Sequence, residues 1–393
     1  MNISNRRISK HLSLRNDLVG LLPYESFDTP VPVRLNTNEN PYEVPELVKS
    51  AVVESVESAV SGSNRYPNDN FLSLREHLAN YIYTLEKLRF SADSIIAANG
   101  SNEIMLEIFQ AFGGPGRACL SFSPAYSMYP QFCRDSFTTL VEVPRVPDKF
   151  TIDIEKAVKQ IQETAPSIII ITNPNNPTGT YTCTDNLRKI LQAAENTPVK
   201  GADADARAVV IVDEAYSDFR DSTHETSLKL MSEFPNLLVV KTLSKAFAFA
   251  GVRLGFAIAS PDIIRALRIV RLPYNLSTIT QAVVIAALKH APEMLGAVEE
   301  IKRERLNMFD QLKYLKYQGE PFLVVPSQAN FIQVGFSSNL PNYQQLPEEL
   351  HAYMLKNGVL IRRVGAPGYF RVTIGKPQEN EHFITILKLW LNN

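Results

Sequence analysis

The chain is poor in the residues that build cross-linked or metal-bound folds. Its 393 residues include only 3 cysteines and 6 histidines. Cys119, Cys133 and Cys183 form no C-x-x-C pair, which argues against a disulfide framework and fits a reducing compartment. The histidines are scattered, with none at ligand spacing from cysteine or carboxylate residues, so we expect no metal site.

The sequence also lacks an excess of one charge and any long apolar run. Lys+Arg (40) and Asp+Glu (41) nearly cancel, so there is no basic excess to neutralise nucleic-acid phosphates. The longest apolar runs, such as 168–171, are strand-sized, whereas a membrane-spanning helix needs about 20 residues. Residues 1–18 contain no apolar segment, which argues against a secretory signal, and Asp17 argues against a transit peptide. We therefore expect a cytoplasmic protein that binds neither nucleic acid nor membrane.

Neither of the glycine-rich nucleotide fingerprints, G-x-G-x-x-G and G-x-x-x-x-G-K-[ST], is present. The middle of the chain instead alternates short β-branched runs with helical patterns. Residues 167–172, 208–212 and 237–241 are predicted strands, and 185–195 and 226–234 are predicted helices between them. Continuous apolar strands separated by helices predict an α/β fold whose mostly parallel sheet is covered on both faces.

The C-terminal part of the chain has a different rhythm. A long charged helix is predicted at 293–315 and another near 347–357. Short strands are predicted at 322–325, 329–334, 359–363 and 370–374. Strands mixed with helices indicate a separate α+β domain. We expect an N-terminal arm over 1–45 that packs with the small domain, a large domain over 46–285 and a small C-terminal domain over 286–393.

Polar residues follow the predicted strands, at the sheet edge where α/β proteins gather their ligands. Asp213 comes directly after a buried strand, and Lys245 follows the next one in surroundings poor in charge. Lost solvation lowers the pKa of a lysine and makes its amine nucleophilic. Ordinary explanations exist as well, because Asp is a favoured helix cap and most lysines lie at the surface. Asn176 lies in a turn rich in proline, which could equally be a simple loop.

A candidate anion site lies at residues 99–103 (NGSNE), which open a predicted helix over 104–112. Backbone N–H groups at a helix N-terminus bind anions, whereas a capping box with Ser101 as the cap would only start the helix. The local sequence leaves both open. Arg253 places a permanent positive charge near the strand end that carries Lys245, unless it is a surface arginine.

Eight sequence blocks follow one another in a familiar order. They are LNTNENPY (35–42), RYP (65–67), NGSNE (99–103), PAYSMY (124–129), NPNNPTG (173–179), VDEAY (212–216), TLSKAFAFAGVRLG (242–255) and FRVTIG (370–375). In this order the chain resembles the fold-type I aminotransferases that depend on pyridoxal 5′-phosphate (PLP), over nearly its whole length. It is most similar to the histidinol-phosphate aminotransferase family, in its actinobacterial form. The resemblance implies a mostly parallel central sheet in a large PLP-binding domain and a smaller α+β C-terminal domain.

The resemblance implies that PLP is the cofactor and that Lys245 carries it as a Schiff base. The freed lysine would then move a proton between substrate and cofactor. Asp213 would pair with the pyridine nitrogen and keep it protonated. Asn176 and Tyr216 would hydrogen-bond the 3′ oxygen of the ring, and Tyr126 would stack on its face. Lys245, Asp213 and Tyr216 are thus the expected catalytic residues.

The cofactor phosphate would bind the backbone amides of Ser101 and Asn102 together with the side chains of Ser244 and Arg253. Tyr66 would reach this phosphate from a partner subunit, so the resemblance implies a homodimer. Without the resemblance, Tyr66, like the other tyrosines, would be taken as a core or interface residue.

The resemblance also implies a substrate site with two arginines. Arg371 would bind the carboxylate of glutamate or the phosphate of histidinol phosphate. Arg362 matches the second arginine, although its neighbour Arg363 could take this place, since only one of two adjacent strand residues faces a given side. Tyr24 and Asn38 would be further substrate contacts, or surface residues.

The implied reaction transfers an amino group between glutamate/2-oxoglutarate and histidinol phosphate/imidazole acetol phosphate, a step of histidine biosynthesis. An aromatic amino-acid aminotransferase would share the PLP apparatus and differ in the substrate pocket. A PLP-dependent decarboxylase, such as one acting on phosphothreonine, would break a different bond at the same carbon. A PLP-binding regulator would need a DNA-binding domain, and the N-terminus shows no helix-turn-helix pattern.

Overall fold

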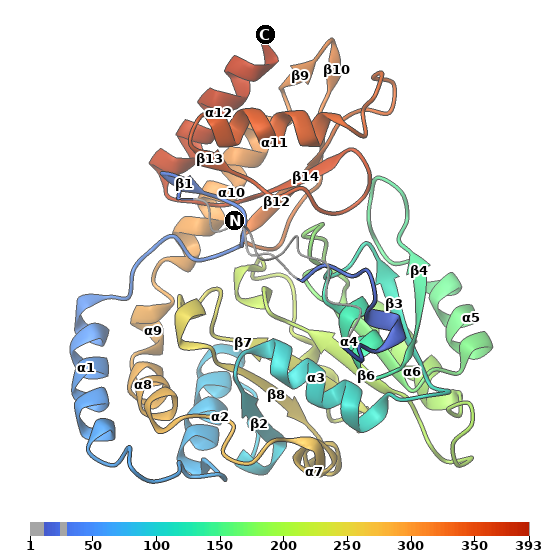
Figure 1. The fold of residues 1–393 in the computed structure, drawn as a ribbon, viewed down its shortest axis with the longest axis vertical. Coiled ribbons are helices and arrows are strands. Elements are labelled where there is room, and N and C mark those ends of the chain that lie inside the picture. Colours follow the sequence, from blue (N-terminus) through green and yellow to red (C-terminus); the bar gives the residue numbers. More distant parts are fainter. Residues whose placement is uncertain (1–11, 24–29, 393) are drawn as a thin grey trace.

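A computed structural model describes residues 12–23 and 30–392. Its centre is a seven-stranded sheet with the order β2-β8-β7-β6-β5-β3-β4 (Figure 1). The strands are β2 (Ile95–Ala98), β3 (Ala118–Ser123), β4 (Thr139–Pro144), β5 (Ile168–Thr172), β6 (Val209–Asp213), β7 (Leu237–Thr242) and β8 (Gly255–Ala259). Only β8 runs antiparallel to its neighbours, β2 and β7. The prediction of a mostly parallel sheet is confirmed, and β5, β6 and β7 are the strands predicted from the apolar runs.

Helices cover both faces of this sheet because its strands are apolar on both sides. In β5, Ile169 and Ile171 pack into one apolar cluster, and Ile168 and Ile170 pack into another on the opposite face. The first cluster includes residues of α1 (Glu46–Val60), α2 (Leu72–Glu86), α5 (Ile154–Thr164), α6 (Thr184–Asn196) and α8 (Thr278–Leu288). The second includes residues of α3 (Ser101–Phe112), α4 (Tyr129–Asp135) and α7 (Pro261–Val270). Strands buried on both faces need this two-sided cover.

A smaller layer of strands and helices lies above the large sheet in Figure 1. Its three-stranded antiparallel sheet has the order β11-β12-β14, and β9 and β10 form a separate hairpin. The elements are β9 (Lys316–Tyr317), β10 (Glu320–Pro321), β11 (Leu323–Val324), β12 (Phe331–Gly335), β14 (Tyr369–Thr373), α10 (Val298–Leu312), α11 (Leu346–Lys356) and α12 (Pro377–Leu391). Strand β1 (Val33–Arg34) pairs in parallel with β13 (Val359–Leu360), so the N-terminal segment joins this layer. The division at residues 45 and 285 stays a prediction.

Two helix predictions are wrong. Residues 226–234 form only the short 3-10 helix η5 (Ser227–Leu230), and the chain then continues in turns up to Pro235, which disfavours helical backbone in the residue before it. The expected helix over 293–315 is broken into α9 (Ala291–Met294) and α10. Gly296 lies in the break, where its amide closes a turn onto the Glu293 carbonyl, and glycine is a poor helix former.

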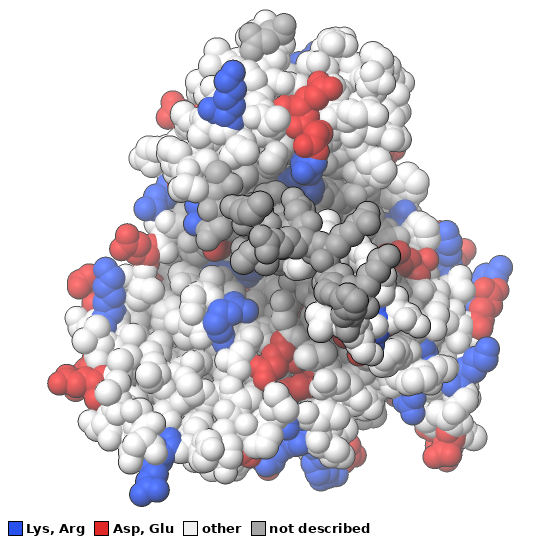
Figure 2. All heavy atoms as spheres, viewed as in Figure 1, with Lys and Arg blue, Asp and Glu red and all other residues white. Residues whose placement is uncertain are grey.

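The surface carries acidic and basic side chains interspersed over the described part of the face in Figure 2, with neither sign gathered into a broad patch. Among the described residues, no helix combines the length and the apolar character needed to cross a bilayer.

Candidate active site

One cavity lies where three parallel strands end. Thr172, Asp213 and Thr242 are the last residues of β5, β6 and β7, and all three line it. The N-terminus of α3 borders the same space, and Arg371 reaches it from β14 in the smaller layer. This is the position at which open α/β sheets hold their ligands.

Most residues that the sequence singled out lie around this cavity. They are Asn38, Ser101, Asn102, Tyr126, Asn176, Asp213, Tyr216, Ser244, Lys245, Arg253, Arg362 and Arg371. Tyr66 does not line it: its side chain is 81% exposed and stacks on Tyr274, with ring centroids 4.6 Å apart. Tyr24 lies outside the described residues.

Lys245 stands just after β7 with its amine inside the cavity. Its Nζ donates a hydrogen bond of 2.9 Å to the carbonyl oxygen of Thr37, in the N-terminal segment. Burial, together with the nearby positive charge of Arg371, lowers the pKa of Lys245 to about 8. The neutral, nucleophilic form of this amine is therefore far more abundant near physiological pH than it is for an ordinary lysine.

Asp213 is only 5% exposed at the end of β6. Its carboxylate accepts a hydrogen bond from the Tyr129 hydroxyl (3.0 Å) and another from the Ala215 amide (3.1 Å). Burial raises the pKa of Asp213 to about 6, although both hydrogen bonds act in the opposite direction. No α-helix begins at Asp213, so the helix-cap interpretation does not hold. A buried carboxylate of this kind favours a cationic partner.

Tyr216 receives two amide donors. Asn38 and Asn176 donate from their side-chain nitrogens to its phenol oxygen at 3.1 and 3.3 Å. Because the oxygen accepts from both amides, the phenol proton can be donated to a third group in the cavity. Arg371 donates from Nη1 to the side-chain oxygen of Asn176 at 2.6 Å, which fixes the orientation of that amide. The Tyr216 hydroxyl is thus held at the cavity wall as a hydrogen-bond donor.

The start of α3 forms a cradle suited to an anion. Helix α3 begins at Ser101 with Gly100 at the N-cap and no side-chain cap, so the interpretation with Ser101 as the cap is wrong. The Glu103 carboxylate instead accepts from the Asn99 amide at 2.5 Å. Uncapped first-turn amides attract anions, and Arg253 adds a permanent charge at the same wall.

Two glycines allow this close packing. A Cβ added at Gly255 would lie 2.2 Å from the Ser101 nitrogen, and one added at Gly100 would lie 2.6 Å from an Nη atom of Arg253. Gly100 also has φ +82°, which other residues rarely adopt. The glycines bring β8, the helix start and the arginine to one point.

The structure separates the two neighbouring arginines. Arg362 lines the cavity and forms an isolated β-bridge with Arg371. Arg363 forms an ion pair with Glu348 on α11, away from the cavity wall. Arg371 is buried, and its Nη2 donates to the carbonyl oxygen of Asn36 at 2.7 Å. Two arginines that are paired across this bridge therefore line the same cavity, an arrangement suited to an oxyanion.

Some residues of the site escaped prediction. Tyr129 is 1% exposed and reads in the sequence as a core tyrosine, yet its hydroxyl contacts Asp213. A hydrogen bond of 2.6 Å joins that hydroxyl to Thr172. Thr37, which binds Lys245, was not singled out either. The signal available was membership of the PAYSMY and LNTNENPY blocks, for Tyr129 and Thr37 respectively.

Within the described parts of the chain, no group of three or more His, Cys, Asp or Glu side chains is arranged to hold a metal ion.

Comparison with known proteins identifies the family. Residues 30–387 match the family described as "Aminotransferase class I and II". The histidinol-phosphate aminotransferase of Bifidobacterium adolescentis is 43% identical over 380 residues, which cover 97% of this chain and 95% of that protein. The structure of histidinol-phosphate aminotransferase from Clostridium acetobutylicum has the same fold, with a TM-score of 0.77 at 22% identity, covering 92% of this chain and 99% of that one. That of the Sinorhizobium meliloti enzyme in complex with pyridoxal-5′-phosphate has a TM-score of 0.77 at 19% identity, covering 92% and 91%. The chain therefore belongs to the class I and II aminotransferases and groups within them with the histidinol-phosphate aminotransferases.

Proposed function

We propose that this protein is a PLP-dependent transaminase that moves an amino group between glutamate and histidinol phosphate, with 2-oxoglutarate and imidazole acetol phosphate as the other pair. The observation that carries this proposal is the shared cavity of Lys245, Asp213 and two arginines. An amine of lowered pKa, a buried carboxylate and an oxyanion site are the groups that such a reaction needs in one place.

The cavity residues fit PLP. The cradle at the start of α3, where Gly100 and Gly255 permit close packing, suits its phosphate, and the buried Asp213 carboxylate suits a protonated pyridine nitrogen. When bound, PLP supplies an aldehyde that condenses with amines and a ring that draws electrons from the neighbouring carbon. Ser101, Asn102, Ser244 and Arg253 would hold the phosphate.

The chain's own groups place and move protons. The neutral amine of Lys245 would take a proton from the substrate carbon and pass it to the cofactor. This role requires the low pKa that burial gives the lysine. Asp213 would hold a proton on the ring nitrogen. Tyr216 and Asn176 would hydrogen-bond the ring oxygen, and Tyr126 would cover one ring face.

Substrate selection would rest on the two arginines. Glutamate carries a carboxylate and histidinol phosphate carries a phosphate, and a pair of guanidinium groups binds either one. Arg371 is held in place by Asn176 and the Asn36 carbonyl, so it is preorganised for this contact. Arg362 faces it across the β-bridge. Asn38 and Tyr24 stay predicted substrate contacts.

We further propose a homodimer in which Tyr66 reaches the partner's cofactor phosphate. Tyr274, which stacks on Tyr66, is 45% exposed, and two apolar side chains close to Tyr274 in the sequence are more exposed still: Leu272 at 71% and Ile269 at 84%. Exposed apolar groups that gather on one surface are typical of an interface. The cytoplasmic location stays a prediction.

Steady-state kinetics with several amino donors tests the proposed function. We expect kcat/KM for histidinol phosphate to exceed that for phenylalanine by about 100-fold or more, because only the former offers a phosphate to the arginine pair. A larger value for phenylalanine would instead assign an aromatic amino-acid aminotransferase. Release of carbon dioxide from phosphothreonine would assign a decarboxylase.

A further inference from the structure

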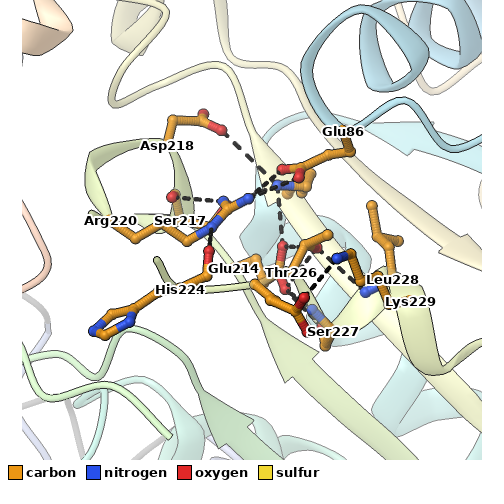
Figure 3. A network of polar contacts seen from close by, with 12 residues as sticks. Glu86, Glu214, Ser217, Asp218, Arg220, His224, Thr226, Ser227, Leu228 and Lys229 are labelled. Atoms are coloured by element: carbon orange, nitrogen blue, oxygen red, sulfur yellow. Dashed lines mark hydrogen bonds and ion pairs between the residues drawn. The ribbon is translucent and has the colours of Figure 1, made fainter. Parts of the chain in front are cut away.

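A buried cluster of charges lies behind the residues that face the cavity. Figure 3 shows Glu214 beside Thr226 and Ser227, and Arg220 beside Glu86 and Ser217. Glu214 follows Asp213 in the chain, and adjacent residues at a strand end point to opposite sides. Asp213 thus faces the cavity, whereas the Glu214 side chain, 1% exposed, turns into the interior.

Lys241 contacts the residues that directly follow Asp213 and Tyr216 in the chain. Its Nζ lies 3.1 Å from the Glu214 carboxylate and donates a hydrogen bond of 2.7 Å to Ser217 Oγ. Glu214 follows Asp213, and Ser217 follows Tyr216. One ammonium group in β7 therefore binds both ends of the short turn whose other side presents Asp213 and Tyr216 to the cavity.

We propose that Lys241 is a positioning residue that clamps the back of the 213–217 turn at two points and so sets the places of Asp213 and Tyr216 against the cofactor. This inference rests on the proposed PLP site, but it does not depend on which amino donor the enzyme uses. Lys241 itself does not line the cavity, so it acts only through its neighbours.

Each end of the clamp has a second anchor. Glu214 also accepts hydrogen bonds from the Thr226 hydroxyl (2.9 Å), the Ser227 amide (2.7 Å) and the Ser227 hydroxyl (2.6 Å). A buried carboxylate with this many donors keeps a single orientation. The Ser217 carbonyl accepts from Arg220 Nη1 at 2.7 Å, and Arg220 in turn binds both carboxylate oxygens of Glu86 at 2.7 Å.

The charges around the ammonium support this arrangement. Burial alone would lower the pKa of Lys241, but the nearby Glu214, Asp218 and Glu86 carboxylates raise it above its ordinary value, against the opposing Arg220. Lys241 therefore stays charged and keeps its bonds across the working range of the enzyme. A displacement of about 1 Å at a reacting group can lower the rate by about 100-fold. The contacts of Lys241 with the 213–217 turn therefore matter to the chemistry, because they fix the positions of Asp213 and Tyr216.

Two variants separate positioning from simple stabilisation. The double variant Lys241→Met, Glu214→Gln removes both charges of the ion pair, and Asp218, which lies 3.9 Å from the Lys241 ammonium, keeps the nearby charge of Arg220. Ser217→Ala cuts only the clamp at the Tyr216 end and leaves the ion pair in place. Lys229→Met is the matched control, because it breaks only a half-exposed ion pair with Glu225 close by.

The main readout is the absorbance of the bound cofactor as a function of pH, measured without substrate, together with the melting temperature of each variant. We expect Ser217→Ala and the double variant to move the midpoint of this titration by about 0.5 pH unit or more, since Tyr216 and Asp213 no longer meet the ring correctly. Their kcat should fall by about 10-fold, with KM for glutamate within about twofold of the wild type. Lys229→Met should titrate like the wild type.

Folded variants that titrate within about 0.2 pH unit of the wild type would overturn the proposal and leave the cluster a purely stabilising one. A shift in the double variant with none in Ser217→Ala would overturn the two-point clamp. If the double variant does not fold, Ser217→Ala decides alone. A wild-type protein with no cofactor absorbance would instead refute the proposed function itself.

Discussion

Tyr129 donates a hydrogen bond of 3.0 Å to the carboxylate of Asp213, although 84 positions separate the two residues in the chain. A bond of 2.6 Å joins the Tyr129 hydroxyl to Thr172, so it reaches the carboxylate already oriented. Burial raises the pKa of the Asp213 carboxyl, and donors of this kind act against that rise by stabilising its charged form.

Tyr129→Phe should therefore weaken cofactor binding. Without the hydroxyl the pKa of Asp213 rises further, and the carboxylate becomes a poorer partner for a protonated ring. We expect the Kd for PLP to increase by about 10-fold, in keeping with ~1.5 kcal/mol for a hydrogen bond to a charged group. Fluorescence titration of the apo-protein measures this, with Tyr314→Phe, at an exposed position, as the control. An unchanged Kd would show that the bond is incidental.

Cofactor capture should follow the titration of Lys245. The pKa of this amine is about 8, so its neutral, reactive fraction rises between pH 7 and pH 9 and then levels off. We expect the rate of PLP addition to the apo-protein, followed by stopped-flow absorbance, to rise by about 10-fold over this range. A rate that keeps rising beyond pH 10 would indicate an ordinary lysine.

Lys245→Ala should abolish both the cofactor absorbance and transamination, because no other lysine is among the described residues that line the cavity. Lys388→Ala removes an exposed lysine on α12 and should leave both unchanged. Turnover at the wild-type rate in Lys245→Ala would remove this lysine from the mechanism.

Arg362 and Arg363 are adjacent in the chain, so the same substitution at each position tests which of them binds the substrate. Arg362 lines the cavity, whereas Arg363 pairs with Glu348 and is 39% exposed. Arg362→Gln should raise KM for histidinol phosphate by about 30-fold, corresponding to the loss of ~2 kcal/mol from a charged contact, and Arg363→Gln should leave it within about twofold. The reverse ranking would mean that the other arginine faces the substrate.

Gly255→Ala should disturb the phosphate cradle. The added Cβ would lie 2.2 Å from the Ser101 nitrogen, so the start of α3 must move, at a cost of ~1–3 kcal/mol in stability. We expect a lower melting temperature and weaker PLP binding. Gly251→Ala is the control, since a Cβ there meets nothing within 4 Å. Equal behaviour of the two variants would exclude a special role for Gly255.

The proposed exchange of Tyr66 between subunits can be tested by complementation. Tyr66→Ala and Lys245→Ala chains should each have little activity alone, whereas a mixed dimer has one site with both residues intact. Random mixing should restore about a quarter of the wild-type activity. Failure of the mixture to exceed the sum of its parts would place Tyr66 outside the partner's site.

Local sequence patterns predicted the strands best. The runs that became β5, β6 and β7 are continuous and β-branched, and such runs form buried strands whatever surrounds them. The ends of helices were predicted less accurately than the strands. Helices α9 and α10 share one amphipathic pattern, and only a turn at Gly296 separates them. The pattern of charges could not show this break, because it continues across both pieces.

The sequence by itself determined the order of the elements and the polar residues at or just after the strand ends, among them Asn176, Asp213 and Lys245. Hydrophobic periodicity and turn chemistry act over a few neighbouring residues, so they can be recognised locally. Only the tertiary structure decided which arginine faces the cavity, that Tyr129 supports Asp213, and that Lys241 binds behind the catalytic turn. Those contacts join residues distant in the chain. They depend on how the sheet and its covering layers pack, which no local pattern encodes.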